Sequence, residues 1–152
     1  MKRLISVILL LATLFSISSC VRDVSAYSML TDFITAYPAE GVIYSPECSE
    51  GSEGYIDSSV ASRIYVFHGE LPRNFAVFLN NHADFGSECG VFVCRDEAER
   101  AQVTEMCEER MRLLSGGEHT LLLRSGNIIF YSTLRDRDRA ESLWTKILRS
   151  HT

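Results

Sequence analysis

Apolar residues recur along the chain with two spacings, one typical of helices and one typical of strands. Between residues 27 and 37 they lie three and four positions apart, which predicts a helix that Pro38 ends. A second, short helix is predicted to begin at the N-cap residue Asp57 and to end near Gly69. Residues 64–67 have high β-propensity, so a strand there is the alternative.

The second half of the chain predicts two longer helices. One begins at Asp96 and ends at Gly116 and Gly117, and the other covers residues 136–149. Four strands are predicted, at residues 75–79, 90–95, 120–124 and 128–133. The last two form a hairpin, because Gly126 between them supplies the positive φ that a tight turn needs.

This order of elements predicts an α+β fold. Strand–strand–helix occurs twice, so we expect a four-stranded antiparallel sheet with the two long helices on one face, preceded by short N-terminal helices. Phe78, Phe92 and Phe130 are expected on the other face. The N-terminal helices are expected to cover that face, and the alternative is a surface for a partner.

Arg110 is a polar residue within the apolar stripe of the first long helix. A buried guanidinium needs a partner, so we expect a salt bridge with Glu88, Glu118 or an acidic residue of a loop. A role in ligand binding is the alternative for this arginine.

The N-terminus predicts export. Lys2 and Arg3 precede an apolar stretch at residues 4–17, which is shorter than the roughly 20 residues that a membrane-spanning helix needs. Ile17-Ser18-Ser19-Cys20 then resembles a bacterial lipobox. We therefore expect a lipoprotein signal peptide at residues 1–20, a tether at residues 21–26 and a single extracytoplasmic α+β domain at residues 27–152.

A lipobox assigns lipidation to Cys20. Its thiol would take a diacylglyceryl group, and two or three acyl chains would hold the protein stably at the cell membrane, on the extracytoplasmic face. Ordinary secretion is the alternative, with cleavage after Val24-Ser25-Ala26 and loss of Cys20. A third reading is an uncleaved buried helix.

Composition and charge exclude other classes. With 46% hydrophobic and 23% charged residues, the chain has the composition of a globular protein. The net charge is −5, and it becomes −7 when Lys2 and Arg3 leave with the leader. Nucleic-acid binding needs a basic face, so we expect no nucleic-acid partner.

Four cysteines follow Cys20, namely Cys48, Cys89, Cys94 and Cys107. They permit two disulfides in three connectivities, but free thiols are also common in cores, and the spacing of zinc sites is absent from the sequence. An extended strand would hold Cys89 and Cys94 about 16 Å apart, too far for a disulfide. The helix from Asp96 would bring Cys107 back over the start of that strand, so Cys89–Cys107 is the best candidate disulfide.

Five segments together resemble a family of small bacterial lipoproteins of unknown function, common in Gram-positive, clostridia-like bacteria. They are Gly54-Tyr55-Ile56-Asp57, residues 75–79, residues 88–93, Met106 with Arg110, and Gly126-Asn127. The resemblance covers residues 54–148 and implies a compartment and a domain, but no site and no cofactor. The four additional cysteines depart from the family, in which the lipobox cysteine is typically alone.

Common catalytic motifs are absent from the sequence, including Gly-x-Ser-x-Gly, phosphate-binding glycine loops and His-Glu-x-x-His. We therefore expect a membrane-anchored binding or interaction module with an unknown protein partner. The alternative is an extracytoplasmic enzyme or metal-binding protein, with a site near His82, Asp84 and Cys89 or Cys94. A polar loop between strands is the simpler reading of His82 and its neighbours.

Overall fold

A computed structural model describes residues 24–69, 71–80, 87–115 and 119–152. The predicted leader, with Cys20, lies outside these residues. The fold is α+β, as predicted, with one open antiparallel sheet in the strand order β1-β2-β3-β5-β4. Within the described ranges, no helix has both the length and the hydropathy to cross a membrane.

Apart from the additional strand β1, the helices and strands follow the predicted order, and α3 ends about one turn earlier than predicted. They are α2 (Ala26–Ala36), β1 (Gly41–Tyr44), α3 (Ser58–Ile64), β2 (Asn74–Asn80), β3 (Glu88–Val93), α4 (Glu97–Ser115), β4 (Leu121–Ser125), β5 (Ile128–Ser132) and α5 (Arg137–His151). Side-chain caps explain two of the starts. Asp57 accepts from two backbone N–H groups of α3, and Asp136 accepts from one of α5.

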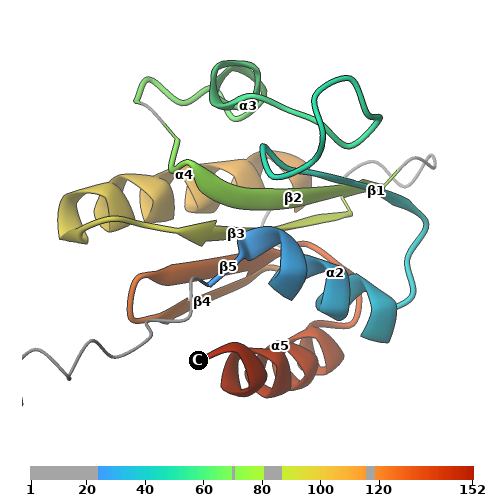
Figure 1. Ribbon diagram of the computed structural model, residues 1–152. Helices are drawn as coiled ribbons and strands as arrows, with labels where there is room; N and C mark the ends of the chain where they lie inside the picture. Colours follow the sequence, from blue (N-terminus) through green and yellow to red (C-terminus); the bar gives the residue numbers. More distant parts are fainter. Residues whose placement is uncertain (1–23, 70, 81–86, 116–118) are drawn as a thin grey trace, which may run out of the picture.

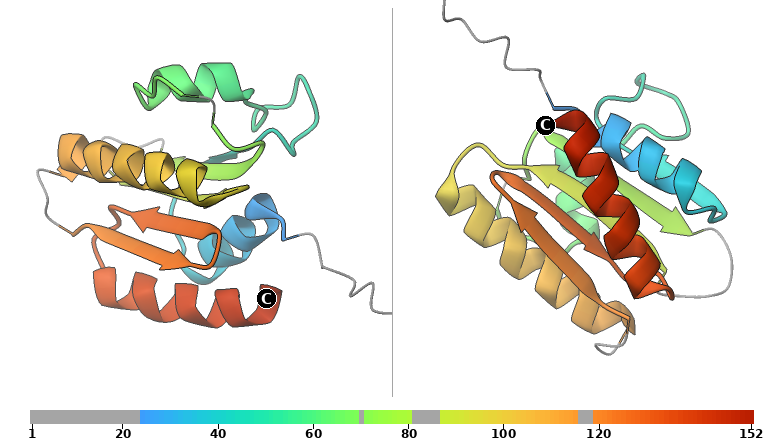
Figure 2. Two further views of the ribbon diagram at one scale, coloured as in Figure 1. Left: turned by 90° about the vertical axis from the view of Figure 1, so that its left-hand side faces the viewer. Right: turned by 90° about the horizontal axis from the view of Figure 1, so that it is seen from below.

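The sheet lies between two layers of helix. Helices α2 and α5 cover one face, and α4 and the short α3 pack on the other (Figures 1 and 2). Trp144 of α5 stacks on Phe130 with ring centroids 4.2 Å apart, and Phe33 of α2 completes that core. On the α4 face, the ring of Phe92 stacks between those of Phe75 and Tyr131.

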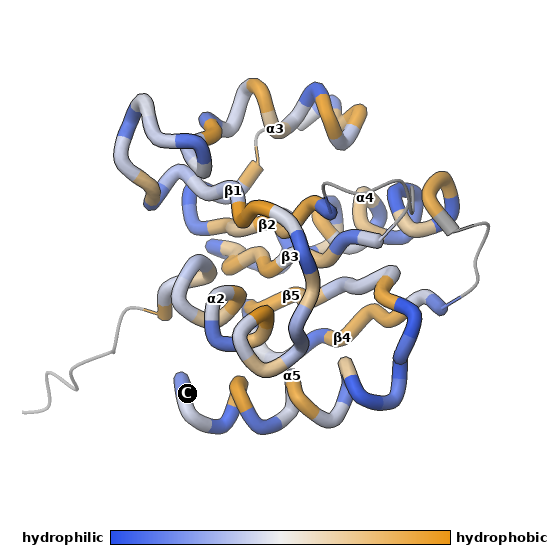
Figure 3. The backbone as a smooth tube through the Cα atoms, turned by 90° about the vertical axis from the view of Figure 1, so that its right-hand side faces the viewer, coloured by the Kyte–Doolittle hydropathy of each residue, from blue (hydrophilic) through white to orange (hydrophobic). Residues whose placement is uncertain are grey.

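Two details of the predicted sheet are wrong. A fifth strand, β1, pairs with β2 inside the segment that the sequence predicts as a loop. The two long helices lie on opposite faces of the sheet, because every residue of β5 is buried and such a strand must be covered on both sides (Figure 3). Phe78 and Phe130 face α2, one of the N-terminal helices predicted to cover them, together with α5. Phe92 faces α4, and α3, the other N-terminal helix, packs on that side as well.

Candidate functional site

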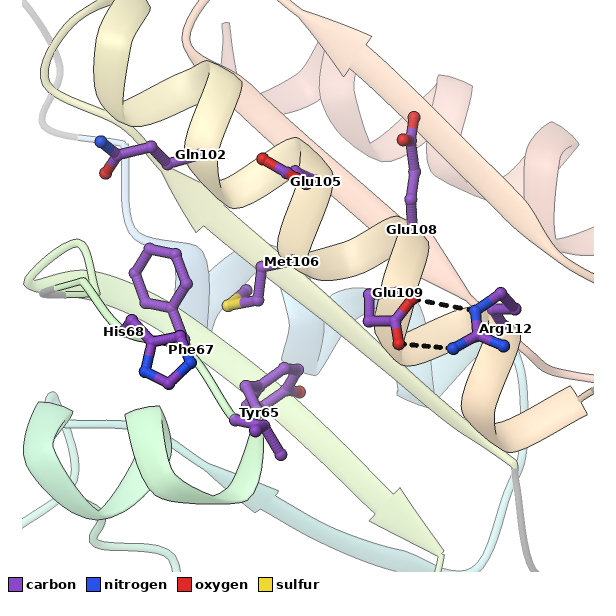
Figure 4. A pocket seen from close by; sticks show the side chains of 10 residues that line it. Tyr65, Phe67, His68, Gln102, Glu105, Met106, Glu108, Glu109 and Arg112 are labelled. Carbon is purple, nitrogen blue, oxygen red and sulfur yellow. Dashed lines mark hydrogen bonds and ion pairs between the residues drawn. The ribbon is translucent and has the colours of Figure 1, made fainter.

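A groove lies between the segment that follows α3 and the outer side of α4, with a volume of about 530 Å³ (Figure 4). Tyr65 and Met106, both buried, lie at its base. It is lined by Tyr65, Val66, Phe67 and His68 on one side and by Gln102, Glu105, Met106, Glu108, Glu109 and Arg112 on the other. Its size is that of a site for a small molecule or for a few side chains of a peptide.

Val66 forms the rim of the groove in a conformation that valine seldom adopts. Helix α3 ends in a Schellman motif, in which the N–H of Val66 donates to the carbonyl of Arg63 and the N–H of Phe67 donates to that of Ser62. The motif places Val66 at φ +52°, where glycine is the usual residue and a β-branched side chain is strained. Its side chain is nevertheless 69% exposed, so packing in the core does not explain its presence.

The α4 wall of the groove is acidic. Glu109 is held by both Nε and Nη2 of Arg112, at 2.9 and 2.6 Å, and Glu108 turns towards β4 and pairs with Arg124 (Figure 4). The carboxylate of Glu105 makes no ion pair or hydrogen bond within the described part of the chain. Glu108 and Glu109 are each paired with an arginine, so Glu105 leaves this wall with one unpaired negative charge.

A buried ion pair fixes the groove from below. Arg110 of α4 donates from Nε and Nη2 to the two oxygens of Glu88, each at 2.9 Å, which confirms the predicted salt bridge. The same guanidinium donates to the carbonyl oxygen of Ile64 at 3.3 Å and lies 5.3 Å from the centre of the Tyr65 ring. Arg110 therefore joins β3, α4 and the end of α3, which positions Val66 and the residues after it.

Two phenols complete this network. The Tyr131 hydroxyl donates to Glu88 at 2.6 Å, so the Tyr65 hydroxyl must be the donor in its own 2.5 Å contact with Tyr131. Burial, and then the negative charge of Glu88, raise the pKa of both tyrosines well above the usual value of 10.0. Hydrogen bonding to Glu88 raises the pKa of Arg110, so the guanidinium stays charged at neutral pH.

The N-terminal end of the described chain is fixed to the sheet. Asn74 donates from Nδ2 to the carbonyl of Val24 at 2.6 Å and accepts from the N–H of Ala26 at 2.9 Å. Ser25 caps α2 by accepting from Ser28, and Ala26 is fully buried. Residues 24–26, which the sequence assigns to the tether, belong to the folded domain.

The predicted Cys89–Cys107 disulfide is not formed. Both thiols are free, and they lie on opposite faces of the sheet, Cys89 in the core under α2 and α5 and Cys107 in the core under α4. Cys94 shares the face of Cys107. Burial raises the pKa of Cys89 and Cys107 well above 9.0 and that of Cys94 to about 12, so all three are protonated thiols at neutral pH.

The alternative site near His82 is not assembled by the residues that the structure describes. His82 and Asp84 lie outside those residues, and Cys89 and Cys94 point to opposite faces of β3. Among the residues described, no three His, Cys, Asp or Glu side chains are grouped as metal ligands. The groove itself is absent from the sequence-based prediction, because valine at position 66 gives no sign of a helix stop.

Comparison of the chain with protein-family models finds no matching family. No curated protein and no solved structure matches it either. The resemblance to small bacterial lipoproteins therefore stays a prediction, and the functional argument depends on the residues of this chain.

Proposed function

We propose that this protein is a binding module anchored by lipid at Cys20 to the extracytoplasmic face of the cell membrane, and that the groove beside α4 is its binding site. The observation that carries the binding role is Val66. The chain keeps a strained, β-branched and mostly exposed side chain where glycine would be easier to accommodate. A side chain that costs stability and is not used in the core is best explained by contact with a ligand.

The contacts of residues 24–26 support the anchor over ordinary secretion. Cleavage after Ala26 would remove the N-cap of α2, both backbone groups that bind Asn74 and a buried alanine. Cleavage before Cys20 keeps all of these contacts. The folded domain is thus suited to the longer N-terminus that the lipobox would leave.

The anchor would hold the domain close to the bilayer. Only residues 21–23 separate Cys20 from Val24, which Asn74 already binds. Four residue steps span at most about 14 Å even when fully extended. The partner would therefore be bound at the membrane surface.

Fractionation of cells that produce the protein with its own leader tests the anchor. Wild type is expected in the membrane fraction, released by detergent but not by high salt, since acyl chains rather than charge hold it. Cys20→Ala is expected in the soluble fraction or as uncleaved precursor, and Cys48→Ala is the matched control that should stay with the membrane. A wild-type protein found in the soluble fraction would refute the proposed anchor.

A further inference from the structure

The apolar surface of the groove continues beyond the groove itself. Leu113 of α4 is 57% exposed and lies seven residues after Met106, which places the two on the same face of the helix. Val66, 69% exposed, lies on the opposite rim. Within the described chain these are two of only three large hydrophobic residues that are exposed; Val66 lines the groove, and the helical spacing places Leu113 on the groove side of α4, beyond the lining residues.

The two walls of the groove approach each other near Gly69, and the α4 wall runs from there along the helix. A Cβ atom added to Gly69 would lie 2.8 Å from the Phe67 ring and 3.5 Å from Oε1 of Gln102, so the two walls approach each other there. From Gln102 to Leu113 the exposed face of α4 runs for about 16 Å at 1.5 Å per residue. An elongated strip of that length fits about three turns of a second helix.

Charge selects among possible ligands. The arginines Arg112 and Arg124 pair with Glu109 and Glu108, whereas the carboxylate of Glu105 has no cationic partner among the described residues and gives the α4 wall one unpaired negative charge. The facing wall, residues 65–68, contributes no arginine or lysine. An anionic ligand or an anionic bilayer would be repelled, and a basic one would be attracted.

We propose that the groove binds a basic amphipathic helix of a partner protein. The apolar side of that helix would pack against Val66, Met106 and Leu113, and its lysines or arginines would pair with Glu105 and its neighbours. This inference depends on the proposed binding role of the groove and adds the class of its ligand. It does not depend on the anchor.

Three fluorescent peptides test the class of ligand. They share an amphipathic helical pattern of leucines and differ only in their polar positions, which are lysine, glutamine or glutamate. Fluorescence anisotropy is measured with the mature chain carrying Cys20→Ala. The lysine peptide is expected to bind about tenfold more tightly than the glutamine peptide, and its affinity is expected to fall as salt is raised. The glutamate peptide is expected not to bind.

Variants locate the binding. Glu105→Lys and Val66→Gly are each expected to lower the affinity for the lysine peptide about fivefold or more. Glu141→Lys, on the exposed side of α5, should leave that affinity unchanged. Val66→Gly relieves the positive φ, so its melting temperature should equal or exceed that of wild type. Weaker binding by this variant therefore cannot be assigned to misfolding.

Each other outcome overturns a defined part of the argument. If the glutamine peptide binds best, the groove is a binding site but the basic class of ligand is wrong. If no peptide binds, or if Val66→Gly binds as wild type does, the groove is not the site. If the free protein forms dimers and Val66→Gly dissociates them, the groove binds a second copy of this chain. If the protein binds anionic vesicles and Val66→Gly abolishes that binding, the groove binds lipid.

Discussion

Removal of Arg110 is expected to destabilise the whole domain. Arg110→Met keeps most of the side-chain volume but leaves the Glu88 carboxylate, 5% exposed, with no cation beside it. Loss of one partner of a buried ion pair costs about 3–5 kcal/mol, because the remaining charge has neither water nor a counter-charge. For a domain of this size, that loss lowers the melting temperature by about 12–20 °C.

Arg112→Met is the matched control. Arg112 lies on the same helix and binds Glu109 through the same two guanidinium nitrogens, but the side chains of this pair are 66% and 54% exposed. Exposed ion pairs contribute at most about 1 kcal/mol. Both substitutions break a two-bond arginine–glutamate pair, one buried and one exposed, and Arg110→Met also removes the contacts with Ile64 and Tyr65.

A double-mutant cycle isolates the pair. Glu88→Leu and Glu88→Leu/Arg110→Met complete it, and the double variant should be more stable than either single one, with a coupling energy of about 3 kcal/mol. Urea unfolding is followed by the fluorescence of Trp144, the one tryptophan, which stacks on Phe130 on the opposite face of the sheet. Additive effects, or a loss below about 1 kcal/mol for Arg110→Met, would refute the reasoning.

Three further predictions follow from the contacts described above. A chain that begins at Tyr27 should be about 2 kcal/mol less stable to urea than one that begins at Val21, since it lacks the Ser25 cap and both Asn74 contacts. Equal stability of the two chains would contradict the assigned role of residues 24–26. In the native protein, Cys48 should react with a thiol reagent first, and Cys89, Cys94 and Cys107 should react only at the rate of unfolding; fast reaction of all four would contradict the core. Stability should fall at alkaline pH, because the three buried thiols and two buried tyrosines have a higher pKa in the folded than in the unfolded protein. Their contribution to stability is fully present below about pH 8.5. It is lost as the pH rises towards the pKa values of the folded protein, at up to about 1.4 kcal/mol per pH unit for each group. Urea titrations at pH 7.5 and above pH 9 that give the same stability would contradict it.

Local signals in the sequence predict the elements well. Asp57 and Asp136 are acidic caps before apolar periodic segments, and both cap the helices that follow them. Arg110 is found from helical spacing alone, because a residue on the buried stripe cannot be charged without a partner. Its partner Glu88 is one of the alternatives that the sequence offers.

Longer-range features depend on information that local patterns do not carry. The side chain of Cys89 points to the face opposite α4 because of its position along β3, and an estimate from distance alone, without side-chain direction, pairs it wrongly with Cys107 of α4. The two-sided burial of β5 decides that the long helices lie on opposite faces, although a short, mostly apolar run in the sequence has the same appearance in either arrangement. The groove depends on valine in a glycine conformation, which only the backbone reveals.

The proposed location depends on the lipid anchor. The most direct test of that anchor is the mass of the N-terminal peptide of the mature protein. The protein is produced with its own leader in a bacterium that processes lipoproteins, extracted with detergent and digested, and the N-terminal peptide is sequenced by mass spectrometry. We predict a chain that begins at Cys20 and carries a diacylglyceryl group on the thiol, with Val24 and Ser25 retained. An unmodified terminus at Tyr27 would contradict the account, since that cleavage removes the contacts through which residues 24–26 join the fold.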